Sequence, residues 1–295
     1  MVDIQLVVDA RALIGESPIW SPDEHALYWA DIKAPALHRI DVRDHSQRSW
    51  TVTSDLGAYC LLPDREGAIV ALREGLCRLD FASGSLTSLG PPPYDPALFR
   101  FNEGACDATG RFWVGVMFDP QKPGAIAQPA SLHSFTLGGG MRHEPDAAEL
   151  HNGMAWSPDG QTFYLSHSNL RTVYAFIFDA SRGSLSGRRP FVETAPRLGV
   201  PDGAAVDSDG GYWCALHGGG RLHRYTAGGT LDLELLLPVS QPTMCAFGGE
   251  ALDVLYITSA RDRLSAEQLQ KEPLAGAVFS ARTGHIGVPR RSTLR

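Results

Sequence analysis

Cysteine pairs with metal-binding or redox spacing are missing from this chain of 295 residues. The five cysteines are odd in number and scattered, and no two of them form a CxxC pair. Structural zinc and thioredoxin-like chemistry are therefore not expected. Four of the five lie inside apolar stretches, which is typical of buried reduced thiols. A reducing cytoplasm is the expected setting for these residues, which are Cys60, Cys77, Cys106, Cys214 and Cys245.

Basic clusters and long apolar runs are missing too. The net charge of -7 would repel the phosphates of nucleic acids and of anionic membranes, so neither is an expected partner. No apolar span approaches the roughly 20 residues that a membrane helix needs, and we expect no amino-terminal leader. With 43% hydrophobic and 20% charged residues, the composition is that of an ordinary soluble globular protein, and we expect it in the cytoplasm.

Helical periodicity is nearly absent. One short helix is predicted at 265–270, with Ser265 as its amino-terminal cap. Elsewhere apolar and polar residues alternate, which indicates strands that bury one face. Strands of this kind are predicted at 37–41, 49–52, 75–80, 130–135, 172–176 and 221–225.

A repeated unit organises the chain. Each copy has an acidic turn followed by an apolar, often aromatic, run, as at 207–216, and glycine and aspartate allow the sharp reversal. Successive turns are 41, 43, 52, 48 and 43 residues apart, which is the length of a four-stranded propeller blade. We therefore predict an all-β fold, a six-bladed β-propeller that occupies 1–295 as a single domain; a β-sandwich would not explain six even repeats. The acidic turn residues are Asp23, Asp64, Asp107, Asp159, Asp207 and Glu250.

Four polar residues occupy the same position in four repeats, five to seven residues before the acidic turn. They are Glu16, Asn102, Asn152 and Asp202. Because the innermost strand of each blade lines the central channel, these side chains should meet near its mouth. Carboxylates brought together repel one another unless a cation lies between them. Two carboxylates and an amide oxygen suit one divalent cation, with coordination positions left for water or substrate.

Each of these residues also has a simpler explanation. Glu16 and Asp202 could accept hydrogen bonds within turns, and Asn-Gly is a common turn dipeptide. Their shared position in separate repeats favours the binding site. The second and sixth repeats have 57–59 (Gly-Ala-Tyr) and 241–243 (Gln-Pro-Thr) at this position, so the mouth is not uniformly acidic.

Arg100 precedes Asn102 by two residues, so both should face the same side of a strand. Its guanidinium could hold polyol hydroxyls or a carboxylate; the alternative is a surface salt bridge. Four histidines, at positions 151, 167, 217 and 223, show no metal-like spacing and are expected to be ordinary hydrogen-bonding residues. His167, at the end of the strand after Asn152, could reach the site.

Several of these motifs together resemble the SMP-30/gluconolactonase/regucalcin family. They are Gly-Glu-Ser-Pro at 15–18, Arg-Phe-Asn-Glu-Gly at 100–104, Asn-Gly at 152–153 with Ser-Pro-Asp-Gly at 157–160, Pro-Asp-Gly at 201–203 and Phe-Gly-Gly at 247–249. The resemblance covers nearly the whole chain in the same order. It implies a six-bladed propeller that hydrolyses sugar lactones with one divalent metal ion. Oxygen ligands admit Ca²⁺, Zn²⁺, Mg²⁺, Mn²⁺ or Fe²⁺.

The resemblance also implies roles for individual residues. The metal ligands would be Glu16, Asn152 and Asp202. Asp202 is also the candidate base for hydrolysis, but a carboxylate on a cation is a weak base, so either the metal acidifies the water enough to compensate or Asp202 mainly positions that water. Arg100, Asn102 and Glu103 would hold the substrate. The sequence departs from the family pattern at Glu103, where aspartate is usual, at Met154, where proline is common, and at His167, where an acidic residue is frequent. The first and last of these changes bear on which lactone is bound.

Three functions remain open from the sequence. The first is the hydrolysis of a sugar lactone to its aldonic acid, with a small-molecule sugar lactone as the partner. The second is an esterase for phosphotriesters or apolar lactones on the same scaffold, which the polar Arg100 and Asn102 disfavour. The third is a non-catalytic propeller that binds a metal, since this fold hosts many functions.

Overall fold

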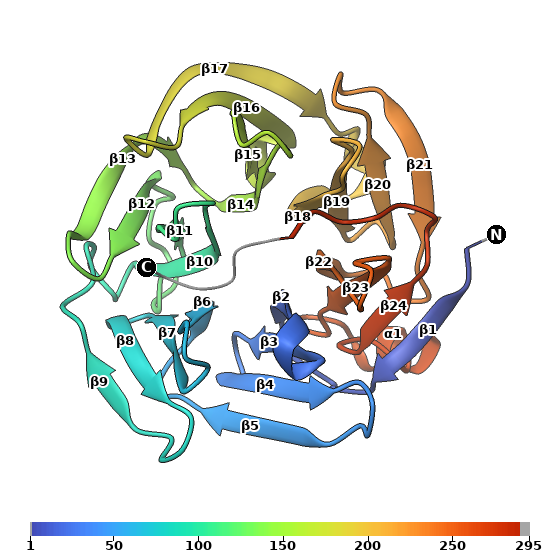
Figure 1. Cartoon of the computed structure of the whole chain (residues 1–295), viewed down its shortest axis with the longest axis horizontal. Helices are drawn as coiled ribbons and strands as arrows, with labels where there is room; N and C mark the ends of the chain where they lie inside the picture. The colour runs from blue at the N-terminus through green and yellow to red at the C-terminus, as the bar shows by residue number, and fades with distance from the viewer. Residues whose placement is uncertain (1, 290–295) are drawn as a thin grey trace.

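Six four-stranded antiparallel sheets form a ring in the computed structural model, which describes residues 2–289 (Figure 1). Each sheet is one blade. In five blades the first strand in the sequence lies nearest the axis; in the sixth, which combines both ends of the described chain, the strand at 242–248 does. The predicted all-β fold and six-bladed β-propeller are therefore confirmed. None of the helices in the described part of the chain is long and apolar enough to cross a membrane.

The strands fall into four sets by distance from the axis. The innermost strands are β2 (Gly15–Ser21), β6 (Leu56–Leu61), β10 (Phe99–Cys106), β14 (His151–Trp156), β18 (Val200–Val206) and β22 (Pro242–Gly248). The second strands are β3 (Ala26–Asp31), β7 (Gly67–Leu72), β11 (Phe112–Phe118), β15 (Thr162–His167), β19 (Tyr212–His217) and β23 (Val254–Ser259). The third strands are β4 (Ala36–Asp41), β8 (Gly75–Asp80), β12 (Ala130–Thr136), β16 (Thr172–Asp179), β20 (Arg221–Tyr225) and β24 (Val278–Ala281). The outermost strands are β5 (Gln47–Thr51), β9 (Leu86–Ser88), β13 (Gly140–Ala148), β17 (Ser184–Glu193), β21 (Leu231–Leu236) and β1 (Ile4–Val8).

The predicted strands all correspond to third strands, apart from 49–52, which overlaps the outermost strand β5. The predicted helix is α1 (Ala266–Lys271), and the Ser265 hydroxyl accepts a hydrogen bond from the backbone N–H of Gln268. The Gln268 side chain accepts one from the backbone N–H of Ser265, so the cap is a capping box. Three short 3₁₀ turns complete the regular structure: Pro22–Glu24, Ser168–Leu170 and Pro196–Leu198.

The ring is closed by strands from the two ends of the described chain. β1 pairs antiparallel with β24, so the sixth blade combines residues 4–8 with three strands from 242–281. Backbone hydrogen bonds across this pair join the beginning of the chain to its last blade. Because closure removes a gap between two blades, it also completes the packing of the first blade against the sixth.

The hydrophobic core is divided among the junctions between blades. Six clusters of buried residues are found in the described chain, and each combines side chains from two neighbouring blades. Trp113 and Trp213 hold corresponding positions on second strands, where the first blade has Tyr28, and all three side chains are at most 1% exposed. In these blades the aromatic run after the acidic turn therefore fills the space between sheets. Four of the five cysteines are also buried, as predicted.

The acidic turns connect to this core. In the fifth blade Asp207 accepts a hydrogen bond from the Gly211 N–H at 2.7 Å and another from the Trp213 indole at 2.8 Å. Asp107 makes the matching bond to Trp113 at 3.0 Å in the third blade. One carboxylate thus fixes both the reversal and the aromatic side chain that follows it, which explains why the two recur together in the sequence.

We expect Gly57→Ala to lower the free energy of unfolding by about 1–3 kcal/mol, because an added Cβ would lie 2.0 Å from the Phe101 carbonyl oxygen of the next blade. Gly138→Ala is the matched control, since a Cβ there would meet no atom within 4 Å. Urea unfolding of the two variants measures the difference. Equal midpoints would contradict the close approach of β6 and β10.

Candidate functional site

Four innermost strands place a polar side chain at the same level of the channel. The residues are Glu16 on β2, Asn102 on β10, Asn152 on β14 and Asp202 on β18, and each is less than a tenth exposed. Asn102 Nδ2 donates to Asn152 Oδ1 at 2.6 Å. Glu16 and Asp202 are close enough for the charge of one to raise the pKa of the other. The structure therefore brings the four predicted residues together, around the axis shown in Figure 1.

A break in strand pairing accompanies each of these side chains. All four strands shift register with their second strand directly after the polar residue, or one residue before it in β18, which is the signature of a β-bulge. The next residue has a positive φ in three blades: 51° at Ser17, 38° at Glu103 and 62° at Gly153. Residues other than glycine seldom adopt this conformation. The backbone thus accepts strain where it directs a side chain to the axis.

The carboxylates at the axis lie where negative charge is unfavourable. Burial, followed by the charge of Glu103, raises the pKa of Glu16 to about 8. Burial, followed by the charges of Glu16 and Glu103, raises the pKa of Asp202 well above its ordinary value. Arg100 acts in the opposite direction on both. Three carboxylates face one guanidinium here, so the site has negative charge left to neutralise.

Arg100 is buried beside Asn102. Its Nη1 donates to Asn102 Oδ1 at 2.8 Å and to the Phe101 carbonyl at 2.9 Å, while Nε donates to Asp119 Oδ2 at 3.0 Å. Nη2 makes no hydrogen bond to a residue within 2–289. The alternative reading of Arg100 as a salt-bridge residue is met by the pair with Asp119, although the Arg100 side chain is 5% exposed and not on the surface. Contact with substrate stays a prediction, and Nη2 is the group free to make it.

A polar cleft of about 480 Å³ lies beside Arg100. Lys33 Nζ contacts Asp55 at 2.9 Å and Asp119 at 2.8 Å, and Arg73 bridges the same two carboxylates. Asp119 follows the end of β11, which pairs with the beginning of β10, so the cleft opens at the end of the ring where the innermost strands begin. The cleft and the axial residues therefore share one face of the propeller.

Glu103 supports the position of Asn152. Its Oε2 accepts a hydrogen bond from the Gly153 N–H at 2.8 Å, and its Oε1 accepts one from the Met154 N–H at 2.6 Å. These bonds cross from the third blade to the fourth and hold the bulge that follows Asn152. The predicted contact of Glu103 with substrate would have to use oxygens that already accept backbone hydrogen bonds.

The axial donor set suits a divalent cation. Glu16 and Asp202 supply carboxylate oxygens and Asn152 an amide oxygen, the hard ligands that Ca²⁺ and Mg²⁺ prefer. Next to Glu16, the buried hydroxyl of Ser17 has no hydrogen-bond partner. Both the residual negative charge and this unpaired hydroxyl fit a cation held at the axis. The sequence-based assignment of the three ligands is compatible with this geometry and stays a prediction.

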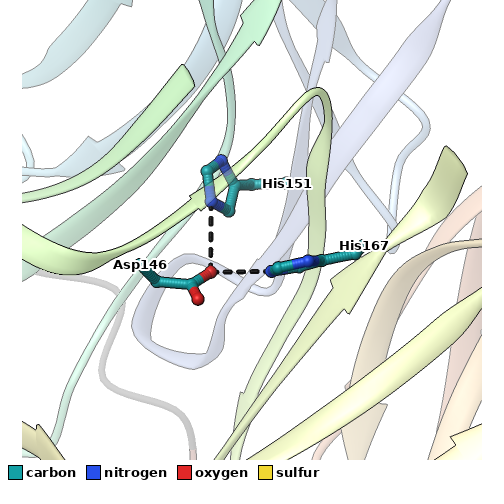
Figure 2. Close-up of side chains that lie close together, drawn as sticks. All are labelled: Asp146, His151 and His167. Carbon is teal, nitrogen blue, oxygen red and sulfur yellow. Dashed lines mark hydrogen bonds and ion pairs between the residues drawn. The ribbon is translucent and has the colours of Figure 1, made fainter. Parts of the chain in front are cut away.

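A second polar cluster lies between the third and fourth blades (Figure 2). Asp146, at the end of β13, has its Oδ2 2.7 Å from His167 Nε2 and 3.3 Å from His151 Nε2. All three side chains are at most 2% exposed.

The expectation that His167 could reach the axial site is corrected by this cluster. His167 bonds to Asp146, and the opposite ring nitrogen lies 3.4 Å from Arg188. Sequence reasoning missed the grouping because Asp146 comes from the preceding blade, so the three residues share no periodic position. The one available signal was His151 directly before Asn152, at the point where a blade begins.

In protein stripped of metal, Glu16 should make stability fall as the pH rises from about 5 to 8. Its pKa is about 8 when folded against an ordinary value of 4.5, so the native state holds the extra proton in this range. Glu16 should contribute up to about 1.4 kcal/mol per pH unit to the slope, the value for one proton. Glu16→Gln should reduce the slope without abolishing it, because the pKa of Asp202 is raised as well. Glu250→Gln, at an exposed turn, should leave the slope unchanged. Urea unfolding at several pH values tests this; equal slopes would contradict the raised pKa.

Comparison with known proteins places this chain in a family. The family model "SMP-30/Gluconolactonase/LRE-like region" matches residues 14–261. The 6-deoxy-6-sulfogluconolactonase of Pseudomonas putida is 39% identical over 290 residues, with 97% of this chain and 96% of that protein covered. The L-arabinolactonase of Azospirillum brasilense is 33% identical over 289 residues, with coverage of 96% and 93%. A solved calcium-binding protein, regucalcin from Agrobacterium tumefaciens, has the same fold, with a TM-score of 0.91 at 24% identity and coverage of 100% and 98%. The chain belongs to the SMP-30/gluconolactonase/LRE-like family.

Proposed function

We propose that this protein is a lactonase that opens a sugar lactone to the aldonic acid with the help of one divalent cation. The observation that carries the proposal is the meeting of Glu16, Asn102, Asn152 and Asp202 from four blades. Two relatives that align over nearly their whole length are named for the hydrolysis of sugar lactones, which supports this substrate class.

Glu16, Asn152 and Asp202 would hold the cation. When bound, a divalent cation supplies a positive charge that polarises the lactone carbonyl and lowers the pKa of water. Glu16 is held in place by the Ser17 N–H, which donates to its Oε2 at 2.7 Å. Asn152 is fixed by Asn102 on one side and by the Ser168 hydroxyl on the other. The donors are therefore positioned before any ligand arrives, which reduces the reorganisation needed in the transition state.

Asp202 is the candidate base. It orients the attacking water and accepts its proton as the oxygen adds to the carbonyl carbon; the ring C–O bond then breaks and the proton passes to the departing hydroxyl. A carboxylate that also holds a cation is a weaker base, because the cation lowers its pKa. Burial and the charges of Glu16 and Glu103 act in the opposite direction, and this preserves the basicity of Asp202.

Arg100 and Asn102 would bind the sugar hydroxyls. The Arg100 guanidinium is fixed by Asp119 and Asn102, which leaves Nη2 as a rigidly placed donor. The cleft lined by Lys33, Arg73 and Asp119 adjoins Arg100 through Asp119, and substituents of the ring would extend toward it. Buried polar groups that are left unpaired by a substrate without hydroxyls would disfavour that substrate.

Asp202→Asn should lower kcat/KM for a sugar lactone by at least about 100-fold, because it removes the base and one cation ligand. Asp209→Asn is the matched control: this carboxylate lies in the same blade and is 72% exposed. Rates are measured after subtraction of spontaneous lactone opening, on chelator-treated protein with and without added metal.

Two results would defeat the assignment. One is an Asp202→Asn rate equal to that of the wild-type enzyme. The other is tight metal binding with thermal stabilisation but no turnover of any sugar lactone, which is the result that a non-catalytic metal-binding propeller predicts.

A hydroxylated lactone should be hydrolysed with at least about tenfold higher kcat/KM than an alkyl lactone of the same ring size, since only the former pairs with Arg100 and Asn102. Arg100→Lys should raise KM for the hydroxylated lactone and change the alkyl lactone little. The alkyl lactone is thus an internal control for folding. A preference for the alkyl lactone or for a phosphotriester would favour the alternative esterase.

A further inference from the structure

The cluster of Asp146, His151 and His167 contains a buried nitrogen without a hydrogen-bond partner. His151 Nδ1 lies 3.0 Å from the Val116 carbonyl oxygen, which can only accept, so this nitrogen carries the proton. In the neutral ring, Nε2 then presents a lone pair. That nitrogen is fully buried, has no hydrogen-bond partner and faces the Asp146 carboxylate at 3.3 Å.

A lone pair that faces a carboxylate inside a protein is unfavourable unless something positive lies between them. His167 does not supply it, because its Nε2 already bonds to Asp146 Oδ2 at 2.7 Å. Arg188 does not supply it either, since its Nη1 contacts the other carboxylate oxygen, Oδ1, at 3.1 Å. Either a second proton on His151 or a metal ion must occupy the gap.

The arrangement of the three donors favours a metal ion. Each of the three residues offers one ligand atom, and these atoms all lie within 4.8 Å of one another. The Nε2 atoms of both rings approach the same oxygen, Asp146 Oδ2 (Figure 2). In a tetrahedral zinc site with bonds of 2.0–2.1 Å, ligand atoms lie about 3.3 Å apart. Small side-chain rotations would produce this spacing. The His151 N–H bond to a backbone carbonyl is also the support that metal-bound histidines usually have.

We propose that Asp146, His151 and His167 form a second metal site, separate from the axial oxygens, that binds a divalent transition-metal ion such as Zn²⁺. Two imidazoles and one carboxylate suit Zn²⁺ or Co²⁺, whereas Ca²⁺ and Mg²⁺ prefer all-oxygen sites. The fourth position is open to water. The two sites therefore select different cations by the chemistry of their donors.

Arg188 sets the affinity of this second site. Its guanidinium lies against Asp146 and His167 and repels a cation there. The side chain is 40% exposed and stacks 3.9 Å from the centre of the Tyr174 ring. Arg188 can therefore withdraw from Asp146 along Tyr174 when a metal binds, and metal and guanidinium compete for the same carboxylate.

A metal at this position would join two blades. Asp146 belongs to the outermost strand of the third blade, and His151 and His167 to the two inner strands of the fourth. The His151 carbonyl also accepts a hydrogen bond from Asn102 at 3.0 Å. The ion would thus hold the beginning of β14, from which Asn152 reaches the axis.

The test is equilibrium dialysis of chelator-stripped protein against Zn²⁺, with excess Ca²⁺ to occupy the axial oxygens. Cys77→Ser serves as the background, because Cys77 is the one cysteine in the described chain that is not fully buried. Asp146→Asn and His167→Gln should each bind one Zn²⁺ fewer than the parent. Asp202→Asn, which alters only the axial site, should keep that Zn²⁺. Co²⁺ bound at the histidine site should give visible absorption bands that the two variants lack.

Asp146→Asn and His167→Gln change buried side chains and could fold poorly. Arg188→Met provides a second test, because the Arg188 side chain is partly exposed. It should bind Zn²⁺ at least about tenfold more tightly, since a repelling charge is removed. Equal Zn²⁺ stoichiometry in the parent, Asp146→Asn and His167→Gln would overturn the proposal. So would unchanged or weaker Zn²⁺ binding by Arg188→Met, which would leave a protonated His151 as the positive charge. Neither the Zn²⁺ stoichiometry nor the Zn²⁺ affinity depends on lactone hydrolysis. A failure of the proposed lactonase function can therefore be distinguished from a failure of this proposal.

Discussion

Repulsion among buried carboxylates is the constraint around which the centre of this propeller is built. Glu16, Glu103 and Asp202 come from three blades. Beyond the effect of burial, the charge of Glu103 raises the pKa of both Glu16 and Asp202, the charge of Glu16 raises that of Asp202, and Arg100 acts in the opposite direction. The surrounding structure holds them in place despite this cost, with a β-bulge in each strand and, in three blades, a positive φ after the inward side chain. Such strain is kept where a ligand benefits from it.

The fold was predictable from the sequence because each blade repeats the same pattern, an acidic turn followed by an apolar strand. In the third and fifth blades the acidic turn and the aromatic run are linked by direct bonds, Asp107 with Trp113 and Asp207 with Trp213, so the two signals appear together there. The short helix was equally readable, since the Ser265 cap is a contact between residues near in sequence. Features that depend on contacts between residues close in sequence can be predicted from the sequence.

Only those residues of the candidate site that occupy the same position in several blades could be predicted from the sequence. Glu16, Asn102, Asn152 and Asp202 share one position in the repeat, so the structure brings them together as expected. The ion-pair network of Arg100 was not readable, because Asp119, Asp55 and Arg73 join it from other positions of two blades. The same holds for Asp146 with His151 and His167, and for the support that Glu103 gives to its neighbouring blade. Contacts between different positions of adjacent blades produce no repeated pattern in the sequence, so they cannot be predicted from its period.

The pairing of β1 with β24 has a consequence for how the molecule assembles. The sixth blade lacks its outer strand until residues 4–8 meet residues 278–281, so the ring is completed by segments that lie almost a full chain length apart. A contact of this sequence separation carries a large loop-closure entropy and is made late. During synthesis the amino-terminal strand must therefore wait, with an unpaired edge, until nearly the whole polypeptide has left the ribosome. Over that interval the open edge of the β1 segment is available to other chains.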